Sequence, residues 1–167
     1  MSGEIVQVNV SAGGVPKQPV PQALVGPLGL EGDLHRFHLH GGPDRALCLY
    51  SIERIQALAA EGHPITPGST GENITVRGLD WEEVVPGRRL RLGPDVLVEI
   101  TSYATPCKTI RACFKQEGFA RLDQKVHPGW SRVYARVLGT GSVHPGDEVV
   151  LLASATSSSP ALASPWR

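Results

Sequence analysis

The chain has 167 residues, enough for one domain with a substantial core and too few for two full ones. Its 16 basic and 16 acidic residues cancel, which argues against a general nucleic-acid or membrane-surface binder, because such proteins use a basic surplus. The three cysteines have no paired CxxC spacing, so neither a disulfide framework nor a four-cysteine zinc site is expected. The chain shows no signal-peptide pattern and no apolar run near the ~20 residues of a membrane helix, so a cytoplasmic protein is expected.

Short strands dominate the predicted elements, because glycine and proline are frequent and spread along the chain. The first strand is predicted at 5–10, and a loop at 13–17 follows it. Further short strands are expected at 33–38 and 46–50, separated by the Gly-Gly-Pro-Asp loop at 41–44.

One helix is predicted after Ser51, a residue type that caps helix N-termini well. Glu53 lies in the first turn, where the helix dipole favours an acid, and Gly62 is placed to end the helix. One face of this helix is apolar and is expected to pack on the sheet. Its residues are Ile52, Ile55, Leu58 and Ala59.

A local pattern occurs twice, at 84–92 and at 143–151. Each copy has an apolar residue, a Pro-Gly turn, two polar residues and an alternating strand. Pro followed by Gly suits a type II turn, and strands entered through such turns favour a sheet rolled up or closed on itself. The alternative is that Pro-Gly marks two unrelated surface turns.

The composition changes at residue 153, after which Ser, Ala, Thr and Pro dominate. We therefore expect a single domain over residues 1–152 and a flexible C-terminal tail over 153–167.

Three histidines, His35, His38 and His40, form an H-x-x-H-x-H cluster. In a strand, His38 and His40 would share a face, but no third zinc ligand stands at a familiar spacing. The alternative is that His40 lines a polar pocket together with Gly41 and Gly42.

Two other segments carry polar groups that could bind an anion. The turn at 68–73 could cradle one with its backbone N–H groups, although it is neither a Walker loop nor a dinucleotide fingerprint. A strand predicted at 129–137 places Arg132, Tyr134 and Arg136 on one face. That face is either a solvated edge or a wall able to hold a phosphate or a pterin.

Cys107 is the most informative single residue. It follows an apolar strand predicted at 96–101, in the run Thr105-Pro106-Cys107-Lys108, and Lys108 and Arg111 would favour its thiolate. A thiolate can ligate a soft metal, carry a persulfide or attack an electrophile, whereas the plain alternative is a small buried hydrophobe. Packing is the expected role of Cys48 and Cys113.

Several runs, in this order along the chain, resemble the MOSC domain, the family named for the C-terminal domain of molybdenum-cofactor sulfurase. They are Gly13 to Lys17, Gly32-Asp33, His40 to Ala46, Gly71 to Asn73, Pro106-Cys107 and the closing stretch from Arg132 to Asp147. The resemblance is closest to small stand-alone bacterial members, including those linked to reduction of N-hydroxylated bases.

The resemblance implies a mostly β, barrel-like fold with a few short helices. It also implies a molybdenum cofactor (molybdopterin), or a sulfur to be delivered to one, near the family cysteine, which corresponds to Cys107. Pyridoxal phosphate is not predicted, because the chain lacks the cysteine-desulfurase domain that would use it.

On this basis the chain is expected to be an oxidoreductase component with Cys107 as catalytic residue and molybdenum ligand. Lys108, Arg111 and Arg132 are expected to neutralise the cofactor's phosphate, and His40 and Asn73 to hydrogen-bond the pterin or the small-molecule substrate. A separate electron-donor or sulfur-donor protein is expected, since no flavin, haem or iron–sulfur pattern is present. The alternatives are a sulfur carrier with a persulfide on Cys107 and a non-catalytic binding module.

Overall fold

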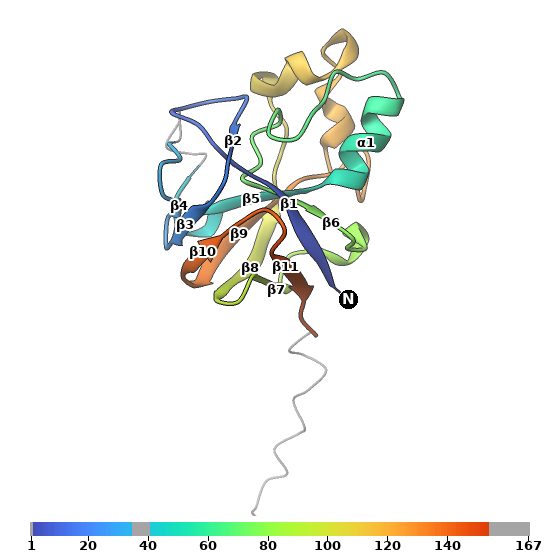
Figure 1. Ribbon diagram of the computed structural model, residues 1–167. Helices are drawn as coiled ribbons and strands as arrows, with labels where there is room; N and C mark the ends of the chain where they lie inside the picture. The colour runs from blue at the N-terminus through green and yellow to red at the C-terminus, as the bar shows by residue number, and fades with distance from the viewer. Residues whose placement is uncertain (1, 35–40, 154–167) are drawn as a thin grey trace, which may run out of the picture.

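A closed barrel of seven strands organises the computed structural model, which describes residues 2–34 and 41–153 (Figure 1). The strands follow one another around the barrel in the order β11, β7, β8, β9, β5, β6 and β1, and β1 pairs with β11 to close it. Strand β2 extends the sheet beside β1, and β10, β3 and β4 form a separate small sheet. The mostly β, barrel-like fold predicted from the sequence is confirmed.

The strands are β1 (Ser2–Val10), β2 (Gln18–Val20), β3 (Ala23–Gly26), β4 (Gly29–Leu30), β5 (Leu47–Ser51), β6 (Ile74–Arg77), β7 (Arg89–Leu92), β8 (Val96–Tyr103), β9 (Val133–Gly139), β10 (Gly141–Val143) and β11 (Glu148–Leu151). The helical elements are α1 (Ile52–Ala60) and the single-turn or short 3₁₀ segments η2 (Pro43–Arg45), η3 (Trp81–Glu83), η4 (Lys108–Cys113), η5 (Lys115–Glu117) and η6 (Phe119–Leu122).

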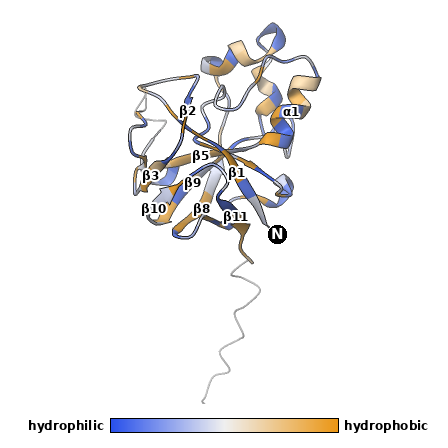
Figure 2. Cartoon of the chain, viewed as in Figure 1, coloured by the Kyte–Doolittle hydropathy of each residue, from blue (hydrophilic) through white to orange (hydrophobic). Residues whose placement is uncertain are grey.

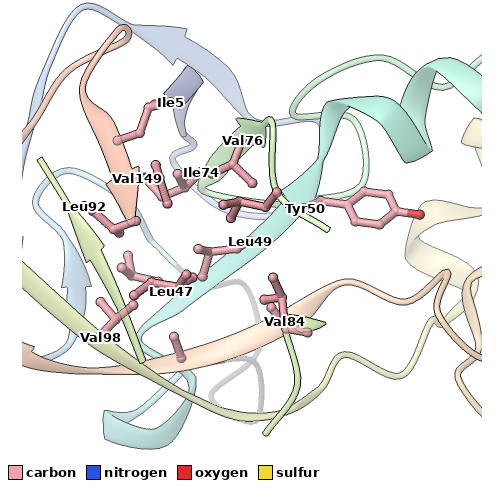
Figure 3. Packing of buried hydrophobic residues seen from close by; sticks show 14 of the residues in the cluster. Ile5, Leu47, Leu49, Tyr50, Ile74, Val76, Val84, Leu92, Val98 and Val149 are labelled. Atoms are coloured by element: carbon pink, nitrogen blue, oxygen red, sulfur yellow. The ribbon is translucent and has the colours of Figure 1, made fainter. Parts of the chain in front are cut away.

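The core fills the barrel because alternate strand residues point inward. In β7, for example, Leu90 and Leu92 are buried while Arg89 and Arg91 are exposed. Hydrophobic stretches follow the barrel strands in Figure 2. Figure 3 shows the interior side chains gathered together, among them Ile5, Leu47, Leu49, Leu92, Val98 and Val149.

The two Pro-Gly units form the turns that the sequence predicts. In the first, the Arg88 N–H donates to the Val85 carbonyl at 3.1 Å, and in the second the Asp147 N–H donates to the His144 carbonyl at 3.1 Å. Gly87 has a φ of 94°, in the left-handed region that the turn requires. The strands that follow, β7 and β11, pair with each other, so the repeated units are neighbours in the barrel.

Helix α1 begins as predicted, with the Ser51 hydroxyl accepting a hydrogen bond from the Arg54 N–H at 3.2 Å. Its buried face is narrower than expected: Ile55 and Leu58 are buried, but Ala59 is exposed. The helix links β5 to the parallel strand β6, and Figure 1 shows it grouped with η4, η5 and η6 away from the barrel strands.

Two predicted strands differ from the structure. The strand predicted at 129–137 begins only at Val133, because Gly129 has a φ of 87° and its N–H donates to the Gln124 side chain instead of a neighbouring strand. Of the strand predicted at 33–38, Asp33 and Leu34 belong to no strand, and the remainder lies outside the described residues. No helix within residues 2–34 and 41–153 is both long and apolar enough to cross a membrane.

Candidate functional site

A cavity of about 470 Å³ lies where six separate stretches of the chain meet. The C-terminal ends of β1 and β8 and the N-terminal ends of β6 and β9 reach the same end of the barrel. The pairs β1–β6 and β8–β9 are antiparallel, and the first residues of β6 and β9, Ile74 and Val133, both pair with Leu49 of β5. The loops at that end supply most of the wall. The lining residues are Gly14, Val15, Lys17, Leu34, Arg45, Cys48, Thr70, Gly71, Asn73, Thr105, Cys107 to Ala112, Arg132 and Tyr134.

The cavity wall is cationic. Its charged residues within the described part of the chain are Lys17, Arg45, Lys108, Arg111 and Arg132, with no acidic residue among them. Lys17 is paired with Asp33 and Arg111 lies 4.0 Å from Glu117, so the remaining cations of the wall are the ones best placed to favour an anionic ligand.

Five of the six residues predicted for the site border this one cavity: Cys107, Asn73, Lys108, Arg111 and Arg132. The sixth, His40, lies outside the described residues, as do His35 and His38. The structure thus brings together side chains that span 60 residues of sequence, from position 73 to position 132.

Cys107 stands immediately before η4, in the loop that leaves β8. The side chain is partly exposed, and its Sγ lies 2.9 Å from the Thr109 Oγ1. That hydroxyl can donate to a thiolate or accept from a thiol. Cys107 therefore presents an accessible sulfur to the cavity beside a hydrogen-bonding partner.

Arg132 contributes a buried cation with a spare donor. The residue is 7% exposed, and its Nη1 donates to the Thr70 carbonyl at 2.6 Å. The Nε is buried and has no hydrogen-bond partner among the described residues. A buried donor without a partner is costly, which points to a ligand that completes its bonding.

Asn73 has most of its hydrogen-bonding capacity engaged within the protein. Its Oδ1 accepts from the Cys48 N–H at 3.0 Å, and its Nδ2 donates to the Asp33 Oδ2 at 2.8 Å and to the Asn9 carbonyl at 3.3 Å. Both amide hydrogens are thus used, which leaves one lone pair of Oδ1 for a ligand. The principal role of Asn73 is to join the cavity wall to β5, to β1 and to Asp33 in the segment after β4.

Sequence reasoning missed the ion pair behind this wall. Lys17 and Asp33 are both largely buried, with the Nζ and Oδ2 atoms 2.6 Å apart. Both residues stand in runs that carry the family resemblance, but nothing in their spacing indicates that they meet. Two further lining residues, Arg45 and Tyr134, are in contact, with the guanidinium 5.2 Å from the ring centroid.

The turn at 68–73 binds a carboxyl group that belongs to the chain itself. The carboxyl oxygens of Glu72 accept from the Gly68 N–H at 3.0 Å, the Thr70 hydroxyl at 2.8 Å and the Thr75 hydroxyl at 3.1 Å. Other N–H groups of the turn also donate within the protein, including that of Gly71 to the Gly68 carbonyl. The expectation that this turn cradles an external anion is therefore replaced by a structural role.

Cys48 and Cys113 are both buried, in agreement with a packing role. Burial raises the pKa of the Cys48 thiol to about 11, and burial also raises the pKa of Cys113, whose Sγ lies 3.2 Å from the Ser69 carbonyl. Cys48 nevertheless borders the cavity, which its apolar sequence neighbourhood does not indicate.

The family model of the MOSC domain matches residues 36–150. Three curated relatives are similar in sequence. A "Reductase" of Gibberella moniliformis is 33% identical over 74% of this chain and 22% of its own length. The Bacillus subtilis protein YflK is 35% identical over 68% of this chain and 50% of its own, and Escherichia coli YiiM is 34% identical over 62% and 48%. The chain thus spans half or less of each relative.

Solved structures show the same fold. YiiM from Geobacillus stearothermophilus superposes with a TM-score of 0.70 and 28% identity, covering 90% of this chain and 75% of that one. YiiM from Escherichia coli gives 0.69 and 28%, covering 92% and 70%. The YUAD protein of Bacillus subtilis, at 18% identity and a TM-score of 0.73 over 89% of this chain and 94% of its own, is similar in fold alone.

Proposed function

Because this chain belongs to the MOSC domain family, we propose that its cavity binds a molybdenum cofactor with Cys107 as the metal ligand. The protein would act as an oxidoreductase component that reduces N-hydroxylated substrates. The observation that carries the proposal is that the accessible thiol of Cys107 and the unpaired donor of Arg132 border one cation-lined cavity.

The residues present fit the organic part of the cofactor. A cavity of about 470 Å³ lies within the usual range for small-molecule sites, roughly 300–1,000 Å³. The cofactor's phosphate needs cationic donors, and Lys108, Arg111 and Arg132 supply them. The buried Nε of Arg132 gains a partner when an anionic oxygen reaches it.

The donor set also fits the metal. Within the residues that the structure describes, no three His, Cys, Asp or Glu side chains form a group able to hold a metal ion. A single thiolate suits a soft metal that arrives with ligands of its own, as pterin-bound molybdenum does. When bound, this cofactor supplies the redox chemistry, and the protein supplies binding, orientation and charge.

The chain's own residues then have distinct tasks. Cys107 holds the metal, and the Thr109 hydroxyl stabilises the thiolate by donating a hydrogen bond to it. Lys108 and Arg111 are the exposed cations of the cavity lining, and their charges offset the negative charge of the ligand. The buried Lys17–Asp33 pair and Asn73 keep the opposite wall in place. Electrons would come from a separate donor protein.

A sulfur carrier is the second candidate, because the same accessible thiol and neighbouring cations also suit a persulfide on Cys107. In that case a separate protein would donate the sulfur. A binding module without chemistry is the third.

The test is elemental and pterin analysis of protein made in a host that synthesises the cofactor. We expect near-equimolar molybdenum and pterin in the native protein, loss of both in Cys107→Ser, and retention of both in Cys113→Ala, the control thiol. Sulfane sulfur released by a reductant, without molybdenum, would identify the sulfur carrier. A folded protein with neither would leave the binding module.

A further inference from the structure

Tyr134 occupies a position in the cavity that the proposed function does not yet use. It is the second residue of β9, and its backbone is paired with Cys48 of β5. Its side chain is partly buried and borders the same cavity as Cys107 and Arg132. The side chain thus faces the space next to the proposed cofactor ligands.

The hydroxyl of Tyr134 has no hydrogen-bond partner within residues 2–34 and 41–153, whereas the ring is held by the cation–π contact with Arg45. Tyr50 provides the contrast: its hydroxyl donates to the Trp130 carbonyl at 2.6 Å. The partly buried hydroxyl of Tyr134 has no such bond within the described residues and so keeps its donor available. The Arg45 contact therefore positions the ring of Tyr134, and its hydroxyl is available to donate a hydrogen bond to a ligand in the cavity.

The surroundings keep this phenol neutral and directed at a ligand. Burial is the main cause that raises the pKa of Tyr134, with Cys48 and Cys107 adding to the rise and Arg132 and Arg45 opposing it. The charged residues of the described wall are all cations, which donate and do not accept. No charged side chain of the described wall can thus accept the phenol's proton, whereas an oxygen of a bound ligand can.

We propose that Tyr134 is a substrate-contacting residue whose hydroxyl donates a hydrogen bond to the nitrogen-bound oxygen of an N-hydroxylated substrate. This inference rests on the proposed function. The cations of the wall match an anionic cofactor, whereas a neutral donor matches the neutral oxygen of a hydroxylamine. A site that hydrogen-bonds such an oxygen also distinguishes the substrate from the product that lacks it.

The test compares binding of N6-hydroxyadenine and adenine, which differ by that oxygen, to the holoprotein by equilibrium dialysis. Tyr134→Phe keeps the ring and its contact with Arg45 and removes only the hydroxyl. We expect N6-hydroxyadenine to bind about three- to tenfold more weakly to the variant, the effect of one neutral hydrogen bond, and adenine to bind unchanged.

Tyr103→Phe is the matched control, because Tyr103 is also a partly buried tyrosine but borders a different cavity of about 330 Å³. It should change neither affinity. Equal weakening of both ligands by Tyr134→Phe, no weakening of either, or failure of the native protein to bind N6-hydroxyadenine would overturn the inference. The molybdenum-to-protein ratio of each sample, measured separately, shows whether the proposed function itself has failed.

Discussion

Among single residues, Glu72 couples the fold to pH. Its carboxyl is fully buried, and burial, the largest cause, raises its pKa above the ordinary value of 4.5, although three hydrogen bonds oppose the rise. Because the folded pKa exceeds the unfolded one, ionisation opposes folding. The contribution of Glu72 to stability is therefore complete below about pH 4.5 and declines as the pH rises through the folded pKa.

Replacing Glu72 with Gln removes this titration. We expect the stability of the variant relative to the native protein to increase with rising pH above about 4.5, measured by urea unfolding at several pH values. Glu31→Gln, at an exposed position, should follow the native pH profile. A parallel profile for the Glu72 variant would show that this carboxyl does not titrate differently on folding.

The cysteines should differ in reactivity. Cys48 and Cys113 are each 6% exposed and have raised pKa values, whereas Cys107 is partly exposed at the cavity. We expect an alkylating reagent near neutral pH to modify Cys107 first and the other two only on unfolding, as read by peptide mass mapping. Earlier labelling of Cys48 or Cys113 would contradict the thiolate-centred site.

Lys108 and Arg111, the exposed cations of the cavity lining, should affect cofactor retention more than folding. We expect Arg111→Ala to release the cofactor about three- to tenfold more readily, and the difference to shrink at high salt. Arg91→Ala is the control, since Arg91 is exposed on β7 and pairs with Glu148 away from the cavity lining. Equal loss of cofactor in both variants would show that the net charge of the protein, and not the position of Arg111 in the site, determines retention.

At the scale of elements, substitution of the glycine in a repeated Pro-Gly turn should lower the free energy of unfolding by a predictable amount. A Cβ built on Gly87 meets no atom within 4 Å, so replacement with Ala strains only the backbone at φ 94°. We expect Gly87→Ala to lower the free energy of unfolding by about 1–2 kcal/mol and Gly87→Asn to lower it less, because Asn tolerates the left-handed conformation better. Chemical denaturation measures both, and equal costs would contradict this explanation.

Local patterns predicted the elements well where the physical cause is itself local. The cap at Ser51 and the turn at Gly87 each depend on residues three positions away or fewer. The start of β9 was predicted too early. The Gly129 N–H donates to the Gln124 side chain instead of to a neighbouring strand, and an alternating sequence pattern does not reveal that bond. Local rules also placed Cys107 in a loop after a strand, where the structure has it.

The rest of the site depends on contacts between distant residues. Lys17 and Asp33 are 16 positions apart, and Arg45 lies 89 positions from Tyr134, so no periodicity connects either pair. The runs that carry the family resemblance contribute residues to the cavity lining, but they do not indicate which side chains meet. Only the closed barrel, which brings six stretches of the chain together at one end, makes these residues neighbours.

For the whole molecule, the described fold reaches its last strand pairing at Leu151, followed by a hydrogen bond from the Leu152 N–H to the Arg89 carbonyl at 3.0 Å. We predict that removal of residues 153–167, which are rich in Ser, Ala and Pro, leaves the melting temperature nearly unchanged. Thermal unfolding of the full and shortened chains is the measurement. A large decrease would mean that the domain boundary near residue 152 is wrong.

Closure of the barrel through β1 and β11 also has a consequence during synthesis on the ribosome. Strand β1 is synthesised some 140 residues before its partner β11, and at about 5–20 residues per second that delay is roughly 7–30 seconds. Throughout that time one side of β1 has no neighbour, so the nascent chain carries an open edge suited to pairing with other chains. Chaperone demand should therefore be greatest just before β11 emerges.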